Sequence, residues 1–501
     1  MRVLFSDGLH INNKNFASLM NYLNQVGAVI TRPSFSNDSI CRFGNYSQWP
    51  GIVALGEEMS ALSADELFKI KFKGINLFNI SCPELMSKCS TKEHWLTADS
   101  YGKSPRELFD TLFINDKEDL LLNMASAKYW IDHWFKILAS KTFDFIFVFS
   151  GSLTYSASLI EVMKGFQGRV FVFESFFTGR HYYCEEKYSH LPNNSDAKFR
   201  SQLVSRTAPG AVINEARLER GIKEALNIKN KNVTQPLPLR KNLFNNGKKS
   251  ILIGGQVLND FSLLKTNCTG IHSLSIYKSI IERLLSETDL NIIFKAHPWE
   301  NKKNNLLQPK TKEHIYNHFS DSSRVAIIED YAISDLFSEI DYVLVINSQL
   351  GIEAALQGFK PLQVGNAFYG KHGFTYDIEN LDSALDIIKN ESSGRLSVQE
   401  YIYFREYMMH MLVDYLVPED VSTGMFKLKQ IFNISPVKKP SPPAKEPIIV
   451  PTVENKSLPN TINNANNASS GSKKLKKFKN NPKRFFSDSK FVVLRTFGKL
   501  L

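Results

Sequence analysis

Residues 341–358 read DYVLVINSQLGIEAALQG, and this stretch decides the fold class. A mostly apolar run ends abruptly at Asn347-Ser348, and the next residues are typical of a short helix. A strand that leads directly into a helix is the building unit of an α/β sheet. Such sheets bind ligands outside the carboxyl ends of their strands, often where a helix begins. The stretch therefore predicts a phosphate-binding position at Ser348.

The same alternation of strands and helices extends in both directions from this stretch. Strands are expected at residues 2–5, 143–149, 169–173, 250–253, 290–294 and 325–328. Helices are expected at 157–165, 275–286 and 333–339, and residues 397–432 have a largely helical pattern. Strand–helix–strand units of this kind form parallel pairs with right-handed crossovers. We therefore expect two doubly wound, Rossmann-like α/β domains that face each other across a cleft.

The length of 501 residues suits two domains and a tail. We place an N-terminal, acceptor-side domain at 1–240 and a C-terminal, nucleotide-sugar-binding domain at 241–435. Residues 436–472 are rich in Pro, Asn, Ser and Lys and are predicted to form a disordered linker. Residues 473–501 form a separate basic, aromatic-rich segment.

The net charge of +11 resides almost entirely in that last segment, where ten basic residues accompany one acid, Asp488. The rest of the chain is close to neutral, which argues against a nucleic-acid groove in the folded body. Basic residues mixed with phenylalanines fit attachment to an anionic membrane surface. A solvated tail, or one that docks on a partner protein, is the alternative.

No signal peptide or membrane-spanning run is expected, so we predict a cytoplasmic protein held peripherally at the inner membrane. The five cysteines show no CxxC spacing and are predicted to be free thiols. No HExxH, GxxxxGK[ST] or GxSxG motif is present, and no metal site is expected.

Polar residues come directly after several of the expected strands in the second half. Gln256 and Asp260 come after the glycine pair Gly254-Gly255, which would allow a ligand to approach the backbone. Lys295 and His297-Pro298 come after the next strand, where the histidine could donate to a phosphate or a sugar carboxylate. Either group could instead be an ordinary turn.

Two carboxylates invite a functional interpretation. Glu353 lies one turn into the helix after Ser348, where it could accept hydrogen bonds from ribose hydroxyls or merely favour the helix N-terminal half. Glu174 ends an apolar strand, so burial would raise its pKa and suit it to general-base catalysis. Arg180 could bind an anionic substrate, or could form a salt bridge with Glu174.

The order of these motifs resembles the bacterial capsule polysaccharide synthesis family, the KpsC/KpsS-like and LipA/LipB-like group of Kdo transferases. The resemblance covers roughly residues 140–380 and rests on a set of strand-end residues: Glu174, Arg180, Gly255-Gln256, Asp260, Lys295, His297-Pro298, Asn347-Ser348, Gly351, Glu353 and Phe368-Tyr369-Gly370. The chain departs from the family at Ser175 and His181, which replace a glycine and a proline, and at Gln349, where a threonine is common.

The resemblance implies a GT-B-like glycosyltransferase that needs no cofactor and uses a nucleotide-sugar donor, CMP-Kdo, with a lipid-linked or polysaccharide acceptor. By the same resemblance, Gln256, Asp260, His297, Ser348 and Glu353 would line the donor side, and Glu174 and Arg180 would face the reacting centre. Glu174 and Asp260 are the candidate catalytic carboxylates. The alternatives are a transferase or capsule polymerase that uses another nucleotide-sugar, such as a UDP-sugar, and a non-catalytic polysaccharide export or assembly subunit.

Overall fold

The computed structural model describes residues 1–33, 42–96, 104–207, 210–229, 243–264, 272–298, 300, 310–329, 331–390 and 394–433. The linker and the basic tail expected at 436–501 lie outside the described residues. Both sheets described below belong to one compact unit of the chain.

The first sheet has six strands in the order β14-β7-β6-β5-β1-β2. They are β1 (Arg2–Phe5), β2 (Val29–Thr31), β5 (Phe145–Phe149), β6 (Arg169–Ser175), β7 (His181–Glu186) and β14 (Val417–Pro418). Strands β2, β1, β5 and β6 are parallel, whereas β7 and β14 pair antiparallel at one edge. The chain moves from β1 to β2 on one side and later to β5 on the other, so the strand order reverses between β1 and β5.

The second sheet is parallel throughout, in the order β10-β9-β8-β11-β12-β13. Its strands are β8 (Ser250–Gly254), β9 (Asn291–Lys295), β10 (Val325–Ile328), β11 (Tyr342–Val345), β12 (Leu362–Gln363) and β13 (Tyr376–Asp377). Here the strand order reverses between β8 and β11. A small hairpin, β3 (Lys71–Phe72) with β4 (Ile75–Asn76), stands apart from both sheets.

Helices cover both faces of each sheet because alternate strand residues are apolar on both sides. In the first domain and its connections they are α1 (Ala17–Gln25), α3 (Pro50–Met59), α4 (Ala64–Lys69), α5 (Leu77–Cys89), α6 (Glu93–Leu96), α7 (Pro105–Asn115), α8 (Lys117–Ser140), α9 (Thr154–Met163), α10 (Arg200–Ser205), α11 (Glu215–Leu226) and α19 (Val421–Asn433). In the second they are α12 (Phe261–Leu264), α13 (Ser273–Glu287), α14 (Lys310–Phe319), α15 (Ile333–Leu336), α16 (Leu350–Leu356) and α17 (Leu381–Asn390); α18 (Val398–Met409) and a π-helix (His410–Tyr415) come next in the chain.

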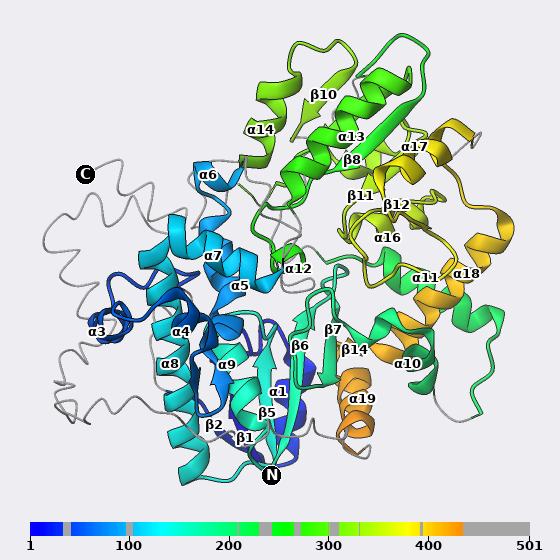
Figure 1. Cartoon of the computed structure of the whole chain (residues 1–501). Helices are drawn as coiled ribbons and strands as arrows, with labels where there is room; N and C mark the ends of the chain where they lie inside the picture. Colours follow the sequence, from blue (N-terminus) through cyan, green and yellow to red (C-terminus); the bar gives the residue numbers. More distant parts are fainter. Residues whose placement is uncertain are drawn as a thin grey trace, which may run out of the picture. The chain divides into compact units, whose positions relative to one another are not determined.

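The alternation is explicit in the first sheet. Ile146 and Val148 of β5 pack with α5, α8 and α9, whereas Phe147 of the same strand packs with α1 and α19. Figure 1 shows α8 and α9 close together in the first domain. The prediction of two doubly wound α/β domains is confirmed.

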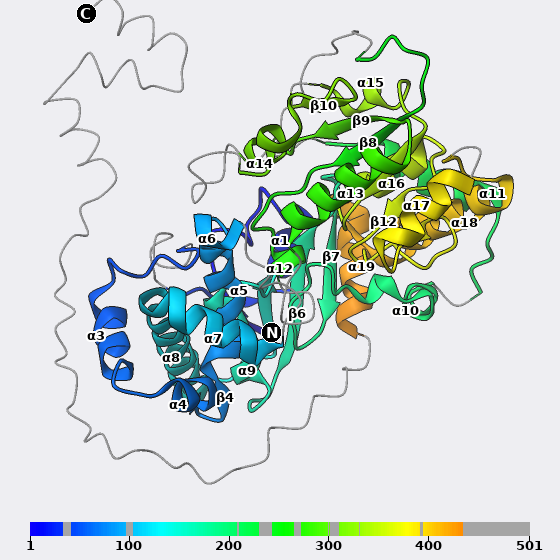
Figure 2. The ribbon, with the colours of Figure 1, turned by 45° about the horizontal axis from the view of Figure 1, so that its top comes forward.

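The last described segment does not remain with the second domain, as the expected boundary at residue 435 would require. Helix α18 lies beside α11, which both ribbon views show (Figures 1 and 2), and the chain then returns to the first sheet. There Val417 pairs with Tyr182 of β7, and Phe432 of α19 packs against Phe147 and Phe171. The largely helical pattern of 397–432 thus contains an edge strand, and its final helix completes the core of the first domain. The helix expected at 333–339 is shorter and ends at Leu336.

Candidate active site

The reversal point of the second sheet brings together the ends of β8 and β11. The amide Nε2 of Gln256 donates to Asn347 Oδ1 (2.7 Å) and to Ser262 Oγ (2.8 Å), and Asn347 Nδ2 donates to the Ser262 carbonyl (3.1 Å). These side chains lie where open α/β sheets bind their ligands. The structure therefore joins the Gln256 and Asn347 motifs, which are separated by 91 residues in the sequence.

The other end of the Gln256 amide makes no hydrogen bond in the described residues. Its side-chain oxygen is buried and has no hydrogen-bond partner there, and the whole residue is only 5% exposed. Unpaired buried acceptors are rare because they lose their hydration without compensation. A bound ligand that donates a hydrogen to Gln256 would remove this cost.

The glycines of these motifs are required by the packing of the protein against itself. A Cβ at Gly254 would lie 2.5 Å from Leu350 Cδ2, and one at Gly255 would lie 2.8 Å from the Lys295 carbonyl oxygen. A Cβ at Gly351 would lie 2.2 Å from the hydroxyl of Tyr369, which itself donates to the Ser348 carbonyl (2.5 Å). The expectation that Gly254-Gly255 makes room for a ligand is therefore replaced by a need for close packing between β8, β9 and α16.

The residues at the end of β9 differ in their contacts. Lys295 is the last residue of β9, and its ammonium donates to the Glu329 carbonyl at the end of β10 (2.7 Å), on the side away from β11. His297 and Pro298 are half-buried at the carboxyl end of β9. Lys295 thus ties the end of β9 to the end of β10.

Glu353 is a half-buried carboxylate in α16 with no hydrogen bond or ion pair among the described residues. Burial raises its pKa to about 7. Ser348 lies just before the helix, and its Oγ accepts from the Leu350 N–H (3.3 Å). An unpaired carboxylate close to this helix start is suited to accept hydrogen bonds from hydroxyl groups of a ligand.

Glu174 lies at the carboxyl end of the first sheet. Its Oε1 accepts the N–H of Ser175 (3.1 Å). The pKa of Glu174 is raised to about 7: burial is the largest cause and the Asp260 carboxylate adds to it, while the Ser175 N–H, His10 and the Ser150 hydroxyl oppose it. A carboxyl group that titrates near neutral pH can exchange protons with substrate, as the sequence predicts for this position.

Asp260 comes to the same place from the second domain. Its Oδ1 accepts the Ser262 N–H at the start of α12 (2.8 Å), and its charge acts on Glu174. Nearby, Gln349 Oε1 accepts the N–H of Phe177 across the domains (3.0 Å), and Asn259 Nδ2 donates to the Ser87 carbonyl (3.1 Å). The charge of Asp260, in the segment between β8 and α12, therefore acts on Glu174 at the end of β6 in the other domain.

Among the residues that the structure describes, no hydrogen bond or ion pair joins Arg180 to these two carboxylates. It is exposed in the turn before β7, and its backbone carbonyl accepts the N–H of Glu419 (2.8 Å). In the described residues no ion pair links Arg180 to Glu174, so the salt bridge considered as the alternative is absent there. The next residue, His181, is buried, and its pKa is lowered to about 4 by that burial and by the charges of Arg180 and Arg220.

Sequence reasoning missed a second polar group at this edge. Asp7 and His10 lie just after β1, and Ser150 lies just after β5, at the reversal point of the first sheet. Ser150 is a non-glycine residue with φ of 60°, a conformation that clusters at functional sites. The signal was present in the sequence: the apolar run Val3-Leu4-Phe5 ends at Ser6-Asp7, as Ile346 ends at Asn347.

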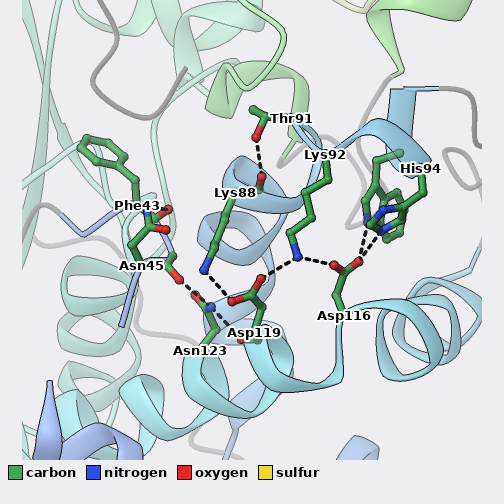
Figure 3. Close-up of polar contacts among 11 residues, drawn as sticks. Phe43, Asn45, Lys88, Thr91, Lys92, His94, Asp116, Asp119 and Asn123 are labelled. Atoms are coloured by element: carbon green, nitrogen blue, oxygen red, sulfur yellow. Dashed lines mark hydrogen bonds and ion pairs between the residues drawn. The ribbon is translucent and has the colours of Figure 1, made fainter. Parts of the chain in front are cut away.

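One group of side chains has the composition of a metal site, namely Cys89, Asp116 and Asp119. Figure 3 shows Lys92 between the two aspartates and Lys88 on the second one. Asp116 also accepts from His94 Nε2 (2.9 Å) and Trp95 Nε1 (2.6 Å), and burial, then Asp116, raise the pKa of the Cys89 thiol. The acids are thus engaged by cations, and the group is an ion-pair cluster that ties α6 to α5 and α8.

Comparison with known proteins connects this geometry to a family. Residues 220–415 match the family "Capsule polysaccharide biosynthesis protein". Lipopolysaccharide-processing protein LpsZ of Rhizobium meliloti is 27% identical over 176 residues, which are 35% of this chain and 37% of that relative. The resemblance inferred from the motifs is confirmed at the level of a capsule polysaccharide synthesis family.

Solved structures give more distant matches. Thermosulfurimonas dismutans KpsC, described as a beta Kdo 2,4 transferase, is 16% identical with a TM-score of 0.40, and the match covers 58% of this chain and 87% of that one. The beta Kdo 2,7 transferase of the same organism is 17% identical with a TM-score of 0.36, covering 59% and 88%. The glycosyltransferase SnogD of Streptomyces nogalater is 12% identical with a TM-score of 0.30, covering 86% and 99%.

Proposed function

Because residues 220–415 carry the capsule polysaccharide biosynthesis region, we propose that this protein is a glycosyltransferase that builds a bacterial capsule or surface polysaccharide from a nucleotide-sugar. The observation that carries the proposal is that the charge of Asp260 in one domain acts on Glu174 in the other, at an edge where the Phe177 N–H donates to Gln349 across the domains. Each carboxylate lies at the edge where α/β sheets bind ligands, so a donor held by one domain can meet an acceptor held by the other.

The donor nucleotide would occupy the reversal point of the second sheet. The unpaired oxygen of Gln256 supports this placement, because a base or sugar N–H or O–H can donate to it. Glu353 would accept from the ribose hydroxyls, and Ser348 and His297 would lie nearest the phosphate. CMP-Kdo is the donor we propose, by resemblance to the family.

The reaction would transfer the sugar from phosphate to an acceptor hydroxyl. The bond from the anomeric carbon to the phosphate oxygen breaks, and its electron pair leaves with the nucleotide. Positive charge develops on the sugar and is stabilised by a nearby carboxylate. In a single displacement Glu174 or Asp260 assists as base; in a double displacement one of them is the nucleophile.

A donor screen tests the proposal. We expect the purified full-length protein to release CMP from CMP-Kdo when a capsule-type or lipid-linked saccharide acceptor is present, with a product one Kdo heavier by mass spectrometry. Turnover with UDP-sugars alone would instead support a different transferase or polymerase. CMP binding with no turnover on any acceptor would support a non-catalytic assembly subunit.

A second part of the proposal concerns location. In the described chain no helix is long and apolar enough to cross a membrane. We place the protein at the inner membrane through residues 473–501, where each basic residue near an anionic surface contributes about 1 kcal/mol.

Deletion of residues 473–501 should therefore release the protein from vesicles that contain phosphatidylserine, while transfer to a soluble acceptor continues. Co-sedimentation at low and high salt measures this, because the attraction is screened by salt. Replacing the five phenylalanines of the segment with serine, with all charges kept, separates apolar from electrostatic anchoring. Unchanged sedimentation of the deletion variant would contradict the membrane role.

A further inference from the structure

The first sheet has its own reversal point, between β1 and β5, and polar side chains gather there. Asp7 and His10 lie just after β1, Ser150 lies just after β5, and Glu174 is near the end of the adjacent strand β6. A crevice at such a reversal is the usual ligand position of an open α/β sheet. The proposed donor uses the equivalent reversal in the second sheet, so this one is available to the acceptor.

Asp7 determines the orientation of the His10 ring. The carboxylate is completely buried. It accepts hydrogen bonds from the backbone N–H of His10 (2.7 Å), the Ser6 hydroxyl (3.0 Å) and the Tyr155 hydroxyl (2.8 Å). Its Oδ1 also lies 3.2 Å from His10 Nδ1. Burial alone would raise the pKa of Asp7, but the bonds and charge of His10 and the bond from Tyr155 together hold it below its ordinary value.

An ionised carboxylate is only an acceptor, so His10 Nδ1 must carry a hydrogen. In the neutral imidazole the basic lone pair is therefore on Nε2. This is the arrangement in which an aspartate fixes the tautomer of a histidine that acts as a general base.

The ring of His10 is also fixed in position. It stacks on Phe149, with centroids 4.5 Å apart and planes 4° from parallel, and its side chain remains 23% exposed. Phe149 pairs with Phe173 in the sheet, and Glu174 is the next residue after Phe173. The stacking thus places His10 on the same edge as Glu174, with which it interacts electrostatically.

We propose that His10 is a catalytic residue of the acceptor site, oriented by Asp7, and that its Nε2 takes the proton of the attacking hydroxyl. The acceptor oxygen then bonds to the anomeric carbon. The group that leaves with the electron pair of the broken bond is the nucleotide in a single displacement and the enzyme carboxylate in a double displacement. The imidazolium so formed is stabilised by the charge of Glu174, with which His10 interacts electrostatically. This inference rests on the proposed glycosyl transfer. In it His10, rather than Glu174 or Asp260, takes the acceptor proton, which leaves the two carboxylates to stabilise charge or to act as nucleophile.

The experiment compares His10→Gln with wild type in the full-length protein, using whichever donor the screen identifies. We expect kcat to fall by about 10²- to 10⁴-fold, with little change in the KM of the donor. The exposed His318 of α14 supplies the matched control, and His318→Gln should keep wild-type turnover. In a His10→Ala variant, added imidazole should restore part of the lost rate, which a purely structural role would not allow.

A measurement without turnover keeps the test independent of the acceptor. Side-chain ¹⁵N spectra should show His10 protonated on Nδ1 in wild type and a mixture of tautomers in Asp7→Asn. CMP affinity by calorimetry and thermal unfolding show whether the variants remain folded.

The outcomes separate the two levels of the proposal. Wild-type protein that transfers no sugar from any donor overturns the proposed function, and this inference with it. An active wild type with His10→Gln within threefold of its kcat, or with His10 protonated on Nε2, overturns the role of His10 alone.

Discussion

Replacing Glu174 with glutamine should lower the turnover of sugar transfer by about 10³-fold, with donor affinity retained. Glutamine keeps the size of the side chain but can neither accept a proton nor carry the charge that stabilises an oxocarbenium-like sugar. Glu353→Gln is the informative comparison, because its carboxyl group is also buried with a pKa near 7 but is proposed to contact ribose. That variant should raise the KM of the donor more than it lowers kcat.

The same Glu174 substitution should stabilise the fold at alkaline pH. Burial raises the pKa of Glu174 to about 7, so the folded state holds the proton more tightly than the unfolded chain. The folded state consequently loses stability as pH rises from the unfolded pKa through about 7. Thermal unfolding of Glu174→Gln should match wild type at about pH 5 and exceed it at about pH 8.

Glu161 of α9 provides the control, since it is partly exposed and pairs with Lys164 on the helix surface. Glu161→Gln should keep wild-type turnover. If Glu174→Gln and Asp260→Asn both transfer sugar at the wild-type rate, the assignment of the reacting centre to these two carboxylates is wrong.

The second large effect is on stability, and it concerns the ion-pair cluster of Figure 3. Asp116→Asn should lower the free energy of unfolding by about 3 kcal/mol. The Asp116 side chain is 1% exposed and accepts from Lys92, His94 and Trp95. An asparagine would present an amide N–H₂ to donors, and Lys92 would keep only Asp119 as a counter-charge.

The loss should depend on pH. Burial alone would raise the pKa of Asp116, but hydrogen bonds from Lys92, His94 and Trp95 outweigh it and lower that pKa below its ordinary value. The contribution is therefore complete above the unfolded pKa and disappears as pH falls through the folded one. The difference in unfolding free energy between wild type and variant should be largest at neutral pH. Urea unfolding followed by tryptophan fluorescence measures it.

Asp110→Asn is the matched control, because Asp110 pairs with Arg106 on the exposed surface of α7 and such pairs contribute less than about 1 kcal/mol. If the cluster is held by lysines, a chelator should leave unchanged the loss of unfolding free energy measured for each of the two variants. If the difference in unfolding free energy between wild type and Asp116→Asn disappears in the presence of chelator, the acids bind a metal instead.

The cluster also matters for the site, since it secures α6. Leu96 of α6 packs with Leu258 and Leu274 of the second domain, and Leu258 lies between Gln256 and Asp260. Loosening α6 should therefore weaken the contact that presents Asp260 to the first domain.

Much of the fold could be predicted because strands and helices leave local patterns in the chain. The strand at Arg2–Phe5 was predicted with its bounds, and those at 250–253 and 290–294 within one residue at each end. The edge strand Val417–Pro418 was missed, since two residues between helices carry no periodicity. Its place is determined by pairing with Tyr182, far away in the sequence.

The residues of the candidate site could likewise be predicted only in part. The polar residues after each strand, Gln256, Asn347 and Glu174 among them, could be found from the change of composition at the strand ends. Lys295 and Arg180 were assigned to the site from their positions and from the family resemblance. In the structure the Lys295 ammonium donates to the Glu329 carbonyl and Arg180 is exposed, and their roles stay predictions.

The stretch 341–358 thus specified a strand, a helix and a ligand edge, because these depend on the order of apolar and polar residues within about a dozen positions. It could not specify that Gln349 would accept a hydrogen bond from Phe177, 172 residues away, or that Gly351 would be needed to admit Tyr369. The electrostatic interaction of Asp260 with Glu174 and the stacking of His10 on Phe149 are likewise products of packing between distant segments. Local composition selects the elements, whereas contacts across the folded chain select which of their side chains can react together.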